Sequence, residues 1–408
     1  MAGLMHRLAV LSMHTSPLAQ PGTGDGGGMN VYVRELAAAL ARAGVQCDVY
    51  TRAFDESLRA IVPVEPGLRV HHVAAGPLAP VAKEDLPELV DEFTAGVLAR
   101  IERGHPAEAI HANYWLSGVA GHTIKHQLDL PLVSTFHTLA RVKAEGDEEP
   151  ERRARAEAHV MGCSDAVLAS CSVEAHQIAA LYGTDPERIE IVAPGVEHAF
   201  FSPGYRPQAR RALGVPATGP MLLFVGRIQP LKSVDVAIDT LAALRSWPDA
   251  FLVVVGGPSG LQGHAELDRA REQVAGLGLA GRVRFVEPQA HELLSTYYRA
   301  ADLCLVPSRS ESFGLVALEA AACGTPVVAA AVGGLRTLVE HGRTGFLVEG
   351  RKPALFADYA TEVLGNPALA EAMSRRAAAR ARGYTWSVAA ARLCRLYTDL
   401  TARSLVEC

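Results

Sequence analysis

Short apolar runs alternate with amphipathic segments along the whole chain, and this pattern predicts strands and helices in regular succession. In the first half the apolar runs cover residues 8–13, 47–51, 109–113, 132–136, 166–170 and 189–192. They show little polar alternation, which is typical of parallel strands buried on both faces. Between two of them, Val33, Leu36, Ala37 and Leu40 follow the spacing of a helix with one apolar face. The pattern favours βαβ units in a doubly wound α/β fold.

The second half repeats this organisation. Its apolar runs cover residues 222–225, 252–255, 283–286, 303–306 and 327–330. Proline and glycine are frequent in residues 198–216, as expected of a linker between domains. We therefore expect one Rossmann-like domain over residues 1–203 and a second over 204–385. The segment 386–408 has apolar residues at helical spacing and is expected to pack back on the first domain.

Composition narrows the class of partner. Of the 408 residues, 49% are hydrophobic and 20% are charged, and the formal net charge is −5. This balance gives no overall attraction for nucleic acid or anionic membranes, so we expect small-molecule partners, no nucleic acid and no membrane. No apolar run is long enough for a membrane span, and no signal peptide is recognised, so we expect a cytoplasmic protein. The seven cysteines are scattered without paired spacing and are expected to be reduced.

Two segments have the composition of phosphate-binding sites. Glycine is repeated over residues 22–28, directly after the first predicted strand and before a helix, where backbone amides can approach an anion. A flexible loop is an equally good interpretation of this segment alone, and it lacks the dinucleotide-binding pattern. Arg227 and Lys232 follow the strand 222–225, and the carboxyl ends of such strands are where open α/β sheets bind ligands. A guanidinium fork with a lysine point charge suits a diphosphate, although such a pair is commonly only a solvated surface.

Glu311 and Glu319 form the most informative pair. They follow the strand 303–306 and are eight residues apart, about 12 Å if both lie on one helix. Carboxylates are good acceptors for paired sugar hydroxyls. Most glutamates at this spacing lie on a surface, but Glu319 stands among alanine and leucine. Burying the Glu319 charge would cost free energy unless a ligand formed hydrogen bonds with the carboxylate, so we expect a ligand contact there.

Together these motifs resemble the retaining GT-B glycosyltransferases of family 4, over nearly the whole chain. Glu311 and Glu319 match the family signature of two glutamates separated by seven residues, and Gly226, Arg227 and Lys232 match its phosphate-binding segment. Residues 12–18 and 27–32 resemble the branch that transfers N-acetylglucosamine from UDP-N-acetylglucosamine to D-inositol 3-phosphate, the first glycosylation of mycothiol biosynthesis. The resemblance implies two Rossmann-like domains facing a central cleft, and a homodimer.

The resemblance also implies roles for individual residues. The expected donor-binding residues are Gly28, Arg227, Lys232, Glu311, Phe313, Gly314, Leu315 and Glu319. The expected acceptor-binding residues are Asn30, Lys83, Tyr114, Thr138 and Arg153, of which four can donate hydrogen bonds to a phosphate. The expected catalytic residues are His137, Arg227, Lys232 and Glu311.

The implied chemistry needs no cofactor and no catalytic metal. Arg227, Lys232 and helix amino termini would supply positive charge. His137 would orient the donor sugar rather than act as general base. The leaving diphosphate would accept the proton of the acceptor in a front-face attack that retains configuration.

Two departures keep other functions open. Residues 157–160 read Glu-Ala-His-Val where the branch has Glu-Glu-Gln-Val, and residues 169–171 read Ala-Ser-Cys in place of Ala-Asn-Thr. One alternative is a paralogue that glycosylates an unphosphorylated aminocyclitol or another small polyol. Another is a protein that binds nucleotide sugars without catalysis.

Overall fold

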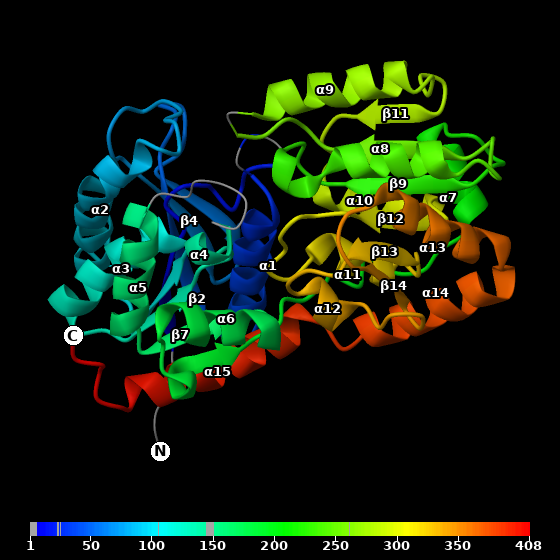
Figure 1. The fold of residues 1–408 in the computed structure, drawn as a ribbon. Coiled ribbons are helices and arrows are strands. Elements are labelled where there is room, and N and C mark those ends of the chain that lie inside the picture. Colours follow the sequence, from blue (N-terminus) through cyan, green and yellow to red (C-terminus); the bar gives the residue numbers. More distant parts are fainter. Residues whose placement is uncertain (1–5, 23, 25, 105, 144–150, 261) are drawn as a thin grey trace. The chain divides into compact units, whose positions relative to one another are not determined.

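The computed structural model describes residues 6–22, 24, 26–104, 106–143, 151–260 and 262–408. The chain divides into two compact units (Figure 1). The first comprises Met1–Ala19, Met29–Gly195 and Trp386–Cys408, and the second comprises Gln20–Gly28 and Val196–Thr385. The main crossover at Gly195 precedes the boundary expected after residue 203, and the segment expected as linker contains a helix, α7 (Arg206–Leu213). Among the described residues, no helix is both long and apolar enough to cross a membrane.

The first unit is built on a sheet whose strand order is β3-β4-β2-β1-β5-β6-β7-β8. The strands are β1 (Arg7–Leu11), β2 (Gln46–Arg52), β3 (Ile61–Glu65), β4 (Leu68–Val73), β5 (Ala109–Asn113), β6 (Leu132–Thr135), β7 (Ala166–Ala169) and β8 (Ile189–Ile191). Its longer helices are α1 (Gly28–Arg42), α2 (Val90–Glu102), α3 (Trp115–Leu128), α5 (Glu151–Cys163), α6 (Ser172–Tyr182) and α15 (Trp386–Thr401). Its described residues also form three short helices, α4 (Ala140–Lys143) and the 3-10 helices η1 (Leu86–Leu89) and η2 (Pro186–Arg188).

One edge of the first sheet departs from the parallel arrangement of the other strands. β3 pairs antiparallel with β4, while the other neighbouring strands run parallel. Sequence analysis found neither strand. β3 is an edge strand with partly exposed residues and with Pro63 in its middle. β4 is buried, but Arg69, His71 and His72 interrupt its apolar residues. Proline is tolerated at an edge, where its missing N–H breaks no ladder.

The second unit has a fully parallel sheet of order β11-β10-β9-β12-β13-β14. Its strands are β9 (Met221–Val225), β10 (Phe251–Val255), β11 (Val283–Val286), β12 (Leu303–Val306), β13 (Val327–Ala330) and β14 (Gly345–Val348). Besides α7, its helices are α8 (Val234–Ala243), α9 (Gly263–Gly276), α10 (Leu294–Ala300), α11 (Leu315–Ala322), α12 (Leu335–Leu338), α13 (Pro353–Gly365) and α14 (Pro367–Ala381). Sequence analysis found five of these strands and missed β14, a short edge strand that begins with glycine.

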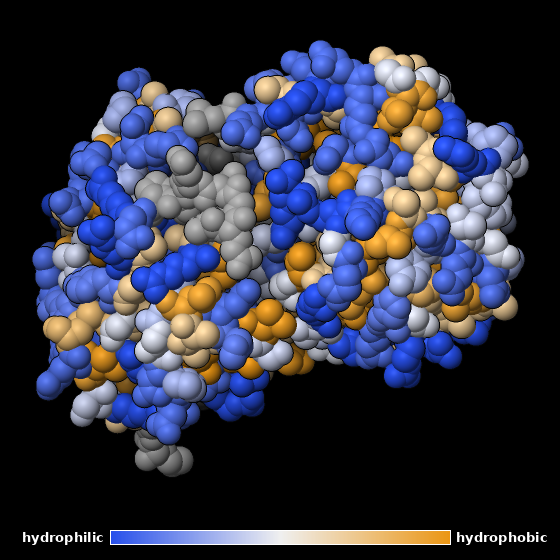
Figure 2. All heavy atoms as spheres, viewed as in Figure 1, coloured by the Kyte–Doolittle hydropathy of each residue, from blue (hydrophilic) through white to orange (hydrophobic). Residues whose placement is uncertain are grey.

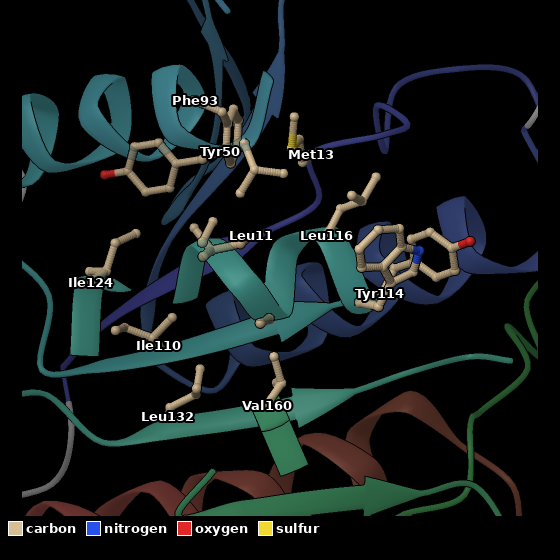
Figure 3. Close-up of a cluster of buried hydrophobic side chains, with 14 of the residues drawn as sticks. Leu11, Met13, Tyr50, Phe93, Ile110, Tyr114, Leu116, Ile124, Leu132 and Val160 are labelled. Atoms are coloured by element: carbon tan, nitrogen blue, oxygen red, sulfur yellow. The ribbon is translucent and has the colours of Figure 1, made fainter. Parts of the chain in front are cut away.

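Each unit has its own apolar core. In the first, Leu11, Ile110 and Leu132 extend from neighbouring strands toward Leu116 and Ile124 of α3 (Figure 3). All five are fully buried, and each such side chain contributes roughly 1.5–3 kcal/mol by leaving water. Figure 2 shows hydrophilic side chains over most of the visible surface of each unit. Burial on both faces fixes the strands of each sheet. Many of the candidate residues directly follow the carboxyl ends of these strands.

Helix α15 is part of the first unit and buries Leu393, Tyr397 and Leu400. The Tyr397 hydroxyl lies 2.7 Å from Nδ1 of His111 on β5. After this helix the chain reaches Cys163 at the end of α5, and Cys163 forms a disulfide with Cys408. The expectation that all seven cysteines are reduced is therefore wrong for these two, whose sequence separation of 245 residues gave no sign of their proximity.

Candidate functional site

In the second unit, neighbouring strands bring three candidate donor-binding residues to one edge of the sheet. Arg227 follows β9, Lys232 closes the 3-10 helix η3 (Pro230–Lys232), and Glu311 follows β12, the neighbour of β9. The Lys232 ammonium lies 2.5 Å from a carboxylate oxygen of Glu311, and both side chains are half-buried. The parallel topology therefore joins two residues that are 79 positions apart.

The glycine-rich segment lies beside Arg227. A Cβ added to Gly27 would be 3.1 Å from Nε of Arg227, and one added to Gly28 would be 3.4 Å from Leu315. Both glycines are grouped with the second unit, whereas sequence analysis placed them in the domain over residues 1–203. Arg227 itself donates to the Ser259 hydroxyl at 3.3 Å. Small residues here leave the space that an anion needs to approach this guanidinium.

Two arguments made for Glu319 from the sequence are wrong. Helix α11 begins at Leu315, so Glu311 is not on the helix of Glu319 and their separation is not a helical rise. Glu319 is buried, but one carboxylate oxygen lies 2.7 Å from Nε2 of His291 and the other accepts from the Tyr298 hydroxyl at 2.8 Å. Protein groups thus explain its burial without a ligand. Burial and the Glu319 charge raise the pKa of Tyr298 well above its usual value, so its hydroxyl stays a donor.

The remaining donor-binding candidates lie where the loop enters α11. Phe313 is buried against the ring of Tyr384, and Gly314 has a φ of +102° that favours glycine. Leu318 N–H donates to the Gly314 carbonyl, which closes the first turn. The preceding amides, including that of Leu315, have no partner within the helix and are suited to sugar or phosphate oxygens.

The loop at Glu311 is held by a close backbone approach. The amide of Gly334 donates to the Glu311 carbonyl at 3.0 Å. A Cβ on Gly333, whose φ is +46°, would lie 1.8 Å from that same carbonyl oxygen. Any residue larger than glycine at this position must therefore displace the Glu311 loop.

We expect Gly333→Ala to weaken UDP binding by about tenfold or more, since a shift of the Glu311 loop need cost only about 1.4 kcal/mol. Gly350→Ala is the matched control. Gly350 also has a positive φ, of +74°, but its Cβ would meet nothing within 4 Å. Calorimetry with UDP and thermal melts of both variants make the comparison. Equal melting temperatures and equal UDP affinities in the two variants would contradict the expected clash.

In the first unit, four of the five expected acceptor-binding residues gather around one ring. Tyr114 follows β5 with a φ of +75°, and its buried ring lies under both the Lys83 ammonium at 5.1 Å and the Arg153 guanidinium at 4.9 Å. Arg153 also donates to the hydroxyl of Thr138 at 3.0 Å. In the described part of the chain, the Tyr114 hydroxyl is buried without a hydrogen-bond partner. Two cations and two hydroxyls therefore share one small region.

The structure distinguishes Arg153 from its neighbours. Arg152 and Arg155 are exposed and pair with Glu88 and Glu151. Arg153 is buried, and its Nε donates to Glu157 at 2.8 Å. Sequence analysis missed Glu157 as the partner of this arginine, although their spacing of four residues on a helix is a usable signal.

Asn30 and His137 have local partners of their own. Asn30 lies on α1, and its amide nitrogen donates to Thr15 at 2.7 Å and to the Ser16 carbonyl at 2.5 Å, which ties α1 to the loop after β1. His137 follows β6 with a φ of +61°, and its Nε2 lies 2.9 Å from the amide oxygen of Asn113. Burial lowers the pKa of His137 to about 3, so it is neutral at physiological pH and a weak base. An orienting role is favoured over general base catalysis.

Functional partners from distant segments were missed by sequence analysis. The His14 ring packs against Tyr114, with ring centroids 4.4 Å apart and ring planes tilted by 39°. His291 and Tyr298 hold Glu319, and Asn113 holds His137. No local sequence pattern marks these pairings, because each is created by the tertiary fold.

Two family descriptions match the chain in succession. "Glycosyltransferase Family 4" matches residues 26–200, and "Glycosyl transferases group 1" matches residues 206–380. Together they cover most of each unit of the structure.

Curated relatives match over nearly the full length. The D-inositol 3-phosphate glycosyltransferase of Actinosynnema mirum is 47% identical over 395 residues, which cover 94% of each chain. The protein of the same name from Mycolicibacterium smegmatis is 48% identical over 390 residues, covering 93% of this chain and 88% of the relative.

Solved structures share the architecture. Sucrose-phosphate synthase from Thermosynechococcus elongatus superposes with a TM-score of 0.91 at 32% identity, covering 97% of this chain and 99% of that one. Anabaena HepE, solved with UDP and glucose, has a TM-score of 0.80 at 21% identity, with coverage of 97% and 100%, and supports the fold alone. The two parallel-sheet units are those of the GT-B fold, and the chain belongs to the glycosyltransferase family of the D-inositol 3-phosphate glycosyltransferases.

Proposed function

We propose that this glycosyltransferase moves N-acetylglucosamine from UDP-N-acetylglucosamine to D-inositol 3-phosphate with retention of configuration, as the first glycosylation of mycothiol biosynthesis. Its relatives are named D-inositol 3-phosphate glycosyltransferases, which supports D-inositol 3-phosphate as the acceptor. The observation that carries the proposal is the cluster of Lys83, Tyr114, Thr138 and Arg153.

This cluster has the chemistry of a phosphomonoester site. A phosphate dianion needs several donors, and hydrogen bonds from charged donors are about twice as strong as neutral ones. Lys83 and Arg153 supply charge, while the hydroxyls of Tyr114 and Thr138 supply neutral donors. The buried Tyr114 hydroxyl in particular gains the partner that it lacks in the described residues. An unphosphorylated acceptor would leave Lys83 without a countercharge from the substrate, whereas Arg153 already has Glu157 as its partner.

The second unit is proposed to bind the donor. Arg227 and Lys232 bind the diphosphate, Glu311 binds the transferred sugar, and Glu319 binds the ribose. Negative charge develops on the diphosphate as the glycosidic bond breaks, and fixed cations stabilise that change most. We propose that these two residues supply the charge without a metal or another cofactor. The leaving oxygen then accepts the proton of the attacking hydroxyl, and His137 orients the sugar. From the family resemblance, we propose that the protein acts as a homodimer in the cytoplasm.

A matrix of donors and acceptors with mass detection of products tests the function. The donors are the UDP and GDP forms of glucose and N-acetylglucosamine, and the acceptors are inositol phosphate, free inositol and an aminocyclitol. The expected product combines N-acetylglucosamine with inositol phosphate, from the UDP donor. A good product from the aminocyclitol with none from inositol phosphate would instead support the paralogue, and no product from any pair would support a binding protein.

Glu319→Gln is expected to weaken UDP binding by about 1.5–3 kcal/mol, because the amide lacks the charge that strengthens a hydrogen bond from ribose. The amide group would also turn a donor toward either His291 or Tyr298, both of which now face carboxylate oxygens. Calorimetry with UDP measures the effect, and Glu292→Gln, at an exposed position nearby, is the control. Unchanged affinity in a folded Glu319→Gln protein would remove Glu319 from the donor site.

A further inference from the structure

A second cluster of reactive side chains lies in the first unit, apart from the residues assigned to acceptor binding. It consists of His122 and His126 on α3, Cys163 at the end of α5, and Cys408. One ligand atom from each residue lies within 4.8 Å of all the others. Nε2 of His126 is 3.3 Å from the Cys408 sulfur, and Nε2 of His122 is 3.9 Å from it. Two imidazoles and two sulfurs therefore surround one point.

Local structure explains why the two histidines converge. They are four residues apart on α3, so both imidazoles lie on the same helical face. Their ring centroids are 4.7 Å apart. Helix α5 packs closely on α3, since a Cβ on Gly118 would be 2.9 Å from a methyl carbon of Val160. This packing brings Cys163 to the same face.

The segment that carries Cys408 is held by a buried ion pair. Lys125 and Asp165 are 2.8 Å apart, and their side chains are 2% and 4% exposed. Asp165 also accepts from the backbone amide of Val406 at 2.7 Å, which fixes the chain two residues before Cys408. Cys408 is thus held in place by contacts independent of its sulfur.

We propose that these four residues form a zinc site when the two cysteines are reduced. Zinc in structural sites prefers four tetrahedral ligands from cysteine and histidine, whose ligand atoms then lie about 3.3–3.8 Å apart. The cluster has this ligand set, and the distances from Cys408 to the two histidines are close to that range. A cavity of about 800 Å³ lined by Lys125, His126 and Cys408 borders the cluster and gives an ion access. With four protein ligands, the ion would join the segment after α15 to α3 and α5.

The disulfide and the zinc site are two states of the same cysteines. A thiol reductant breaks the S–S bond by exchange: two reductant thiols are oxidised to a disulfide, and Cys163 and Cys408 each gain a hydrogen. Zinc then binds both sulfurs as thiolates and releases their two protons.

The test uses the full-length protein, reduced anaerobically with dithiothreitol, freed of metal by a chelator and desalted. Zinc chloride is titrated against a chromophoric chelator, and cobalt(II) is titrated in parallel to report geometry. We expect about one zinc ion per chain and the visible spectrum of tetrahedral cobalt with thiolate ligands.

Matched variants locate the site. Cys408→Ser and His126→Ala change exposed residues and are expected to weaken zinc binding by about a hundredfold or more, because a structural site needs all four ligands. Cys394→Ser and His159→Ala are the controls. Cys394 is a free thiol outside the cluster, and the ring of His159 lies 4.7 Å from that of His122 without belonging to the ligand set.

Three results would overturn the proposal. The reduced protein could fail to bind zinc, or the disulfide could resist dithiothreitol so that no reduced pair exists. Zinc binding that survives Cys408→Ser unchanged would place the ion elsewhere. Because Cys408 and His126 are exposed, their replacement leaves the core intact, and thermal melts verify that each variant is folded.

Discussion

Replacing Lys232 with alanine is expected to lower the turnover number about a hundredfold to a thousandfold, the usual cost of removing one group that stabilises developing negative charge. The ammonium lies at the carboxyl edge of the second sheet, 2.5 Å from Glu311, where both a diphosphate and a sugar are proposed to bind. Turnover is measured at saturating donor and acceptor, with and without excess EDTA. We expect activity of the unaltered protein to persist in EDTA.

Lys352→Ala is the matched control, since it removes an exposed lysine from the same unit. Lys232→Ala also removes one member of an ion pair whose side chains are 22% and 17% exposed, so thermal melts of both variants verify that each is folded. Turnover of Lys232→Ala within a few fold of the unaltered protein would exclude the proposed role. Complete loss of activity in EDTA, restored by magnesium, would show that a metal supplies the charge.

Replacing Lys83 with alanine is expected to raise the KM for inositol phosphate about tenfold or more, because a lost charge-assisted hydrogen bond costs at least about 1.4 kcal/mol. The KM for the donor should change little. Discrimination between inositol phosphate and free inositol should fall by a similar factor, since the cation recognises only the phosphate. Tyr114→Phe removes the hydroxyl that is proposed as a second hydrogen-bond donor to the phosphate. It keeps the aromatic ring that both cations contact.

Arg153 is a poorer choice for this experiment. It pairs with Glu157, which is fully buried, and removing one member of a buried pair typically costs 3–5 kcal/mol of stability. Arg152→Ala is a suitable control, because that neighbour is exposed and pairs with Glu88. If Lys83→Ala leaves both KM values unchanged while the protein uses an aminocyclitol well, the phosphate site is wrong and the paralogue is correct.

The sequence predicted the strand-end positions best. Uninterrupted apolar runs identified β9 and β12, and parallel topology then required Arg227, Lys232 and Glu311 to share an edge. The same reasoning placed Tyr114 after β5 and His137 after β6. Doubly buried strands are readable because burial on both faces dictates their composition over several consecutive residues.

Features set by single tertiary contacts could not be predicted in this way. Glu319 was taken to need a ligand because its neighbours in sequence are apolar, yet His291 and Tyr298 reach it from another segment. The Cys163–Cys408 disulfide likewise depends on where α15 returns to the first unit. Edge strands such as β3 were missed because their residues are partly exposed, and such a strand contains no continuous apolar run that sequence analysis could detect.

The ion pair of Lys232 with Glu311 has a consequence for selectivity among anions. A carboxylate of the protein already occupies one of the three N–H donors of this ammonium, so an incoming anion either shares the ammonium with Glu311 or displaces that carboxylate. Chloride carries a single charge and would contact only the Lys232 ammonium, so it gains little binding free energy from displacing Glu311. A diphosphate gains more, since it can contact Arg227 as well and can leave Glu311 free to accept hydroxyl groups of the sugar. In the proposed donor site, Glu311 would thus compete with incoming anions for Lys232, and a nucleotide sugar would overcome this competition more readily than simple salts.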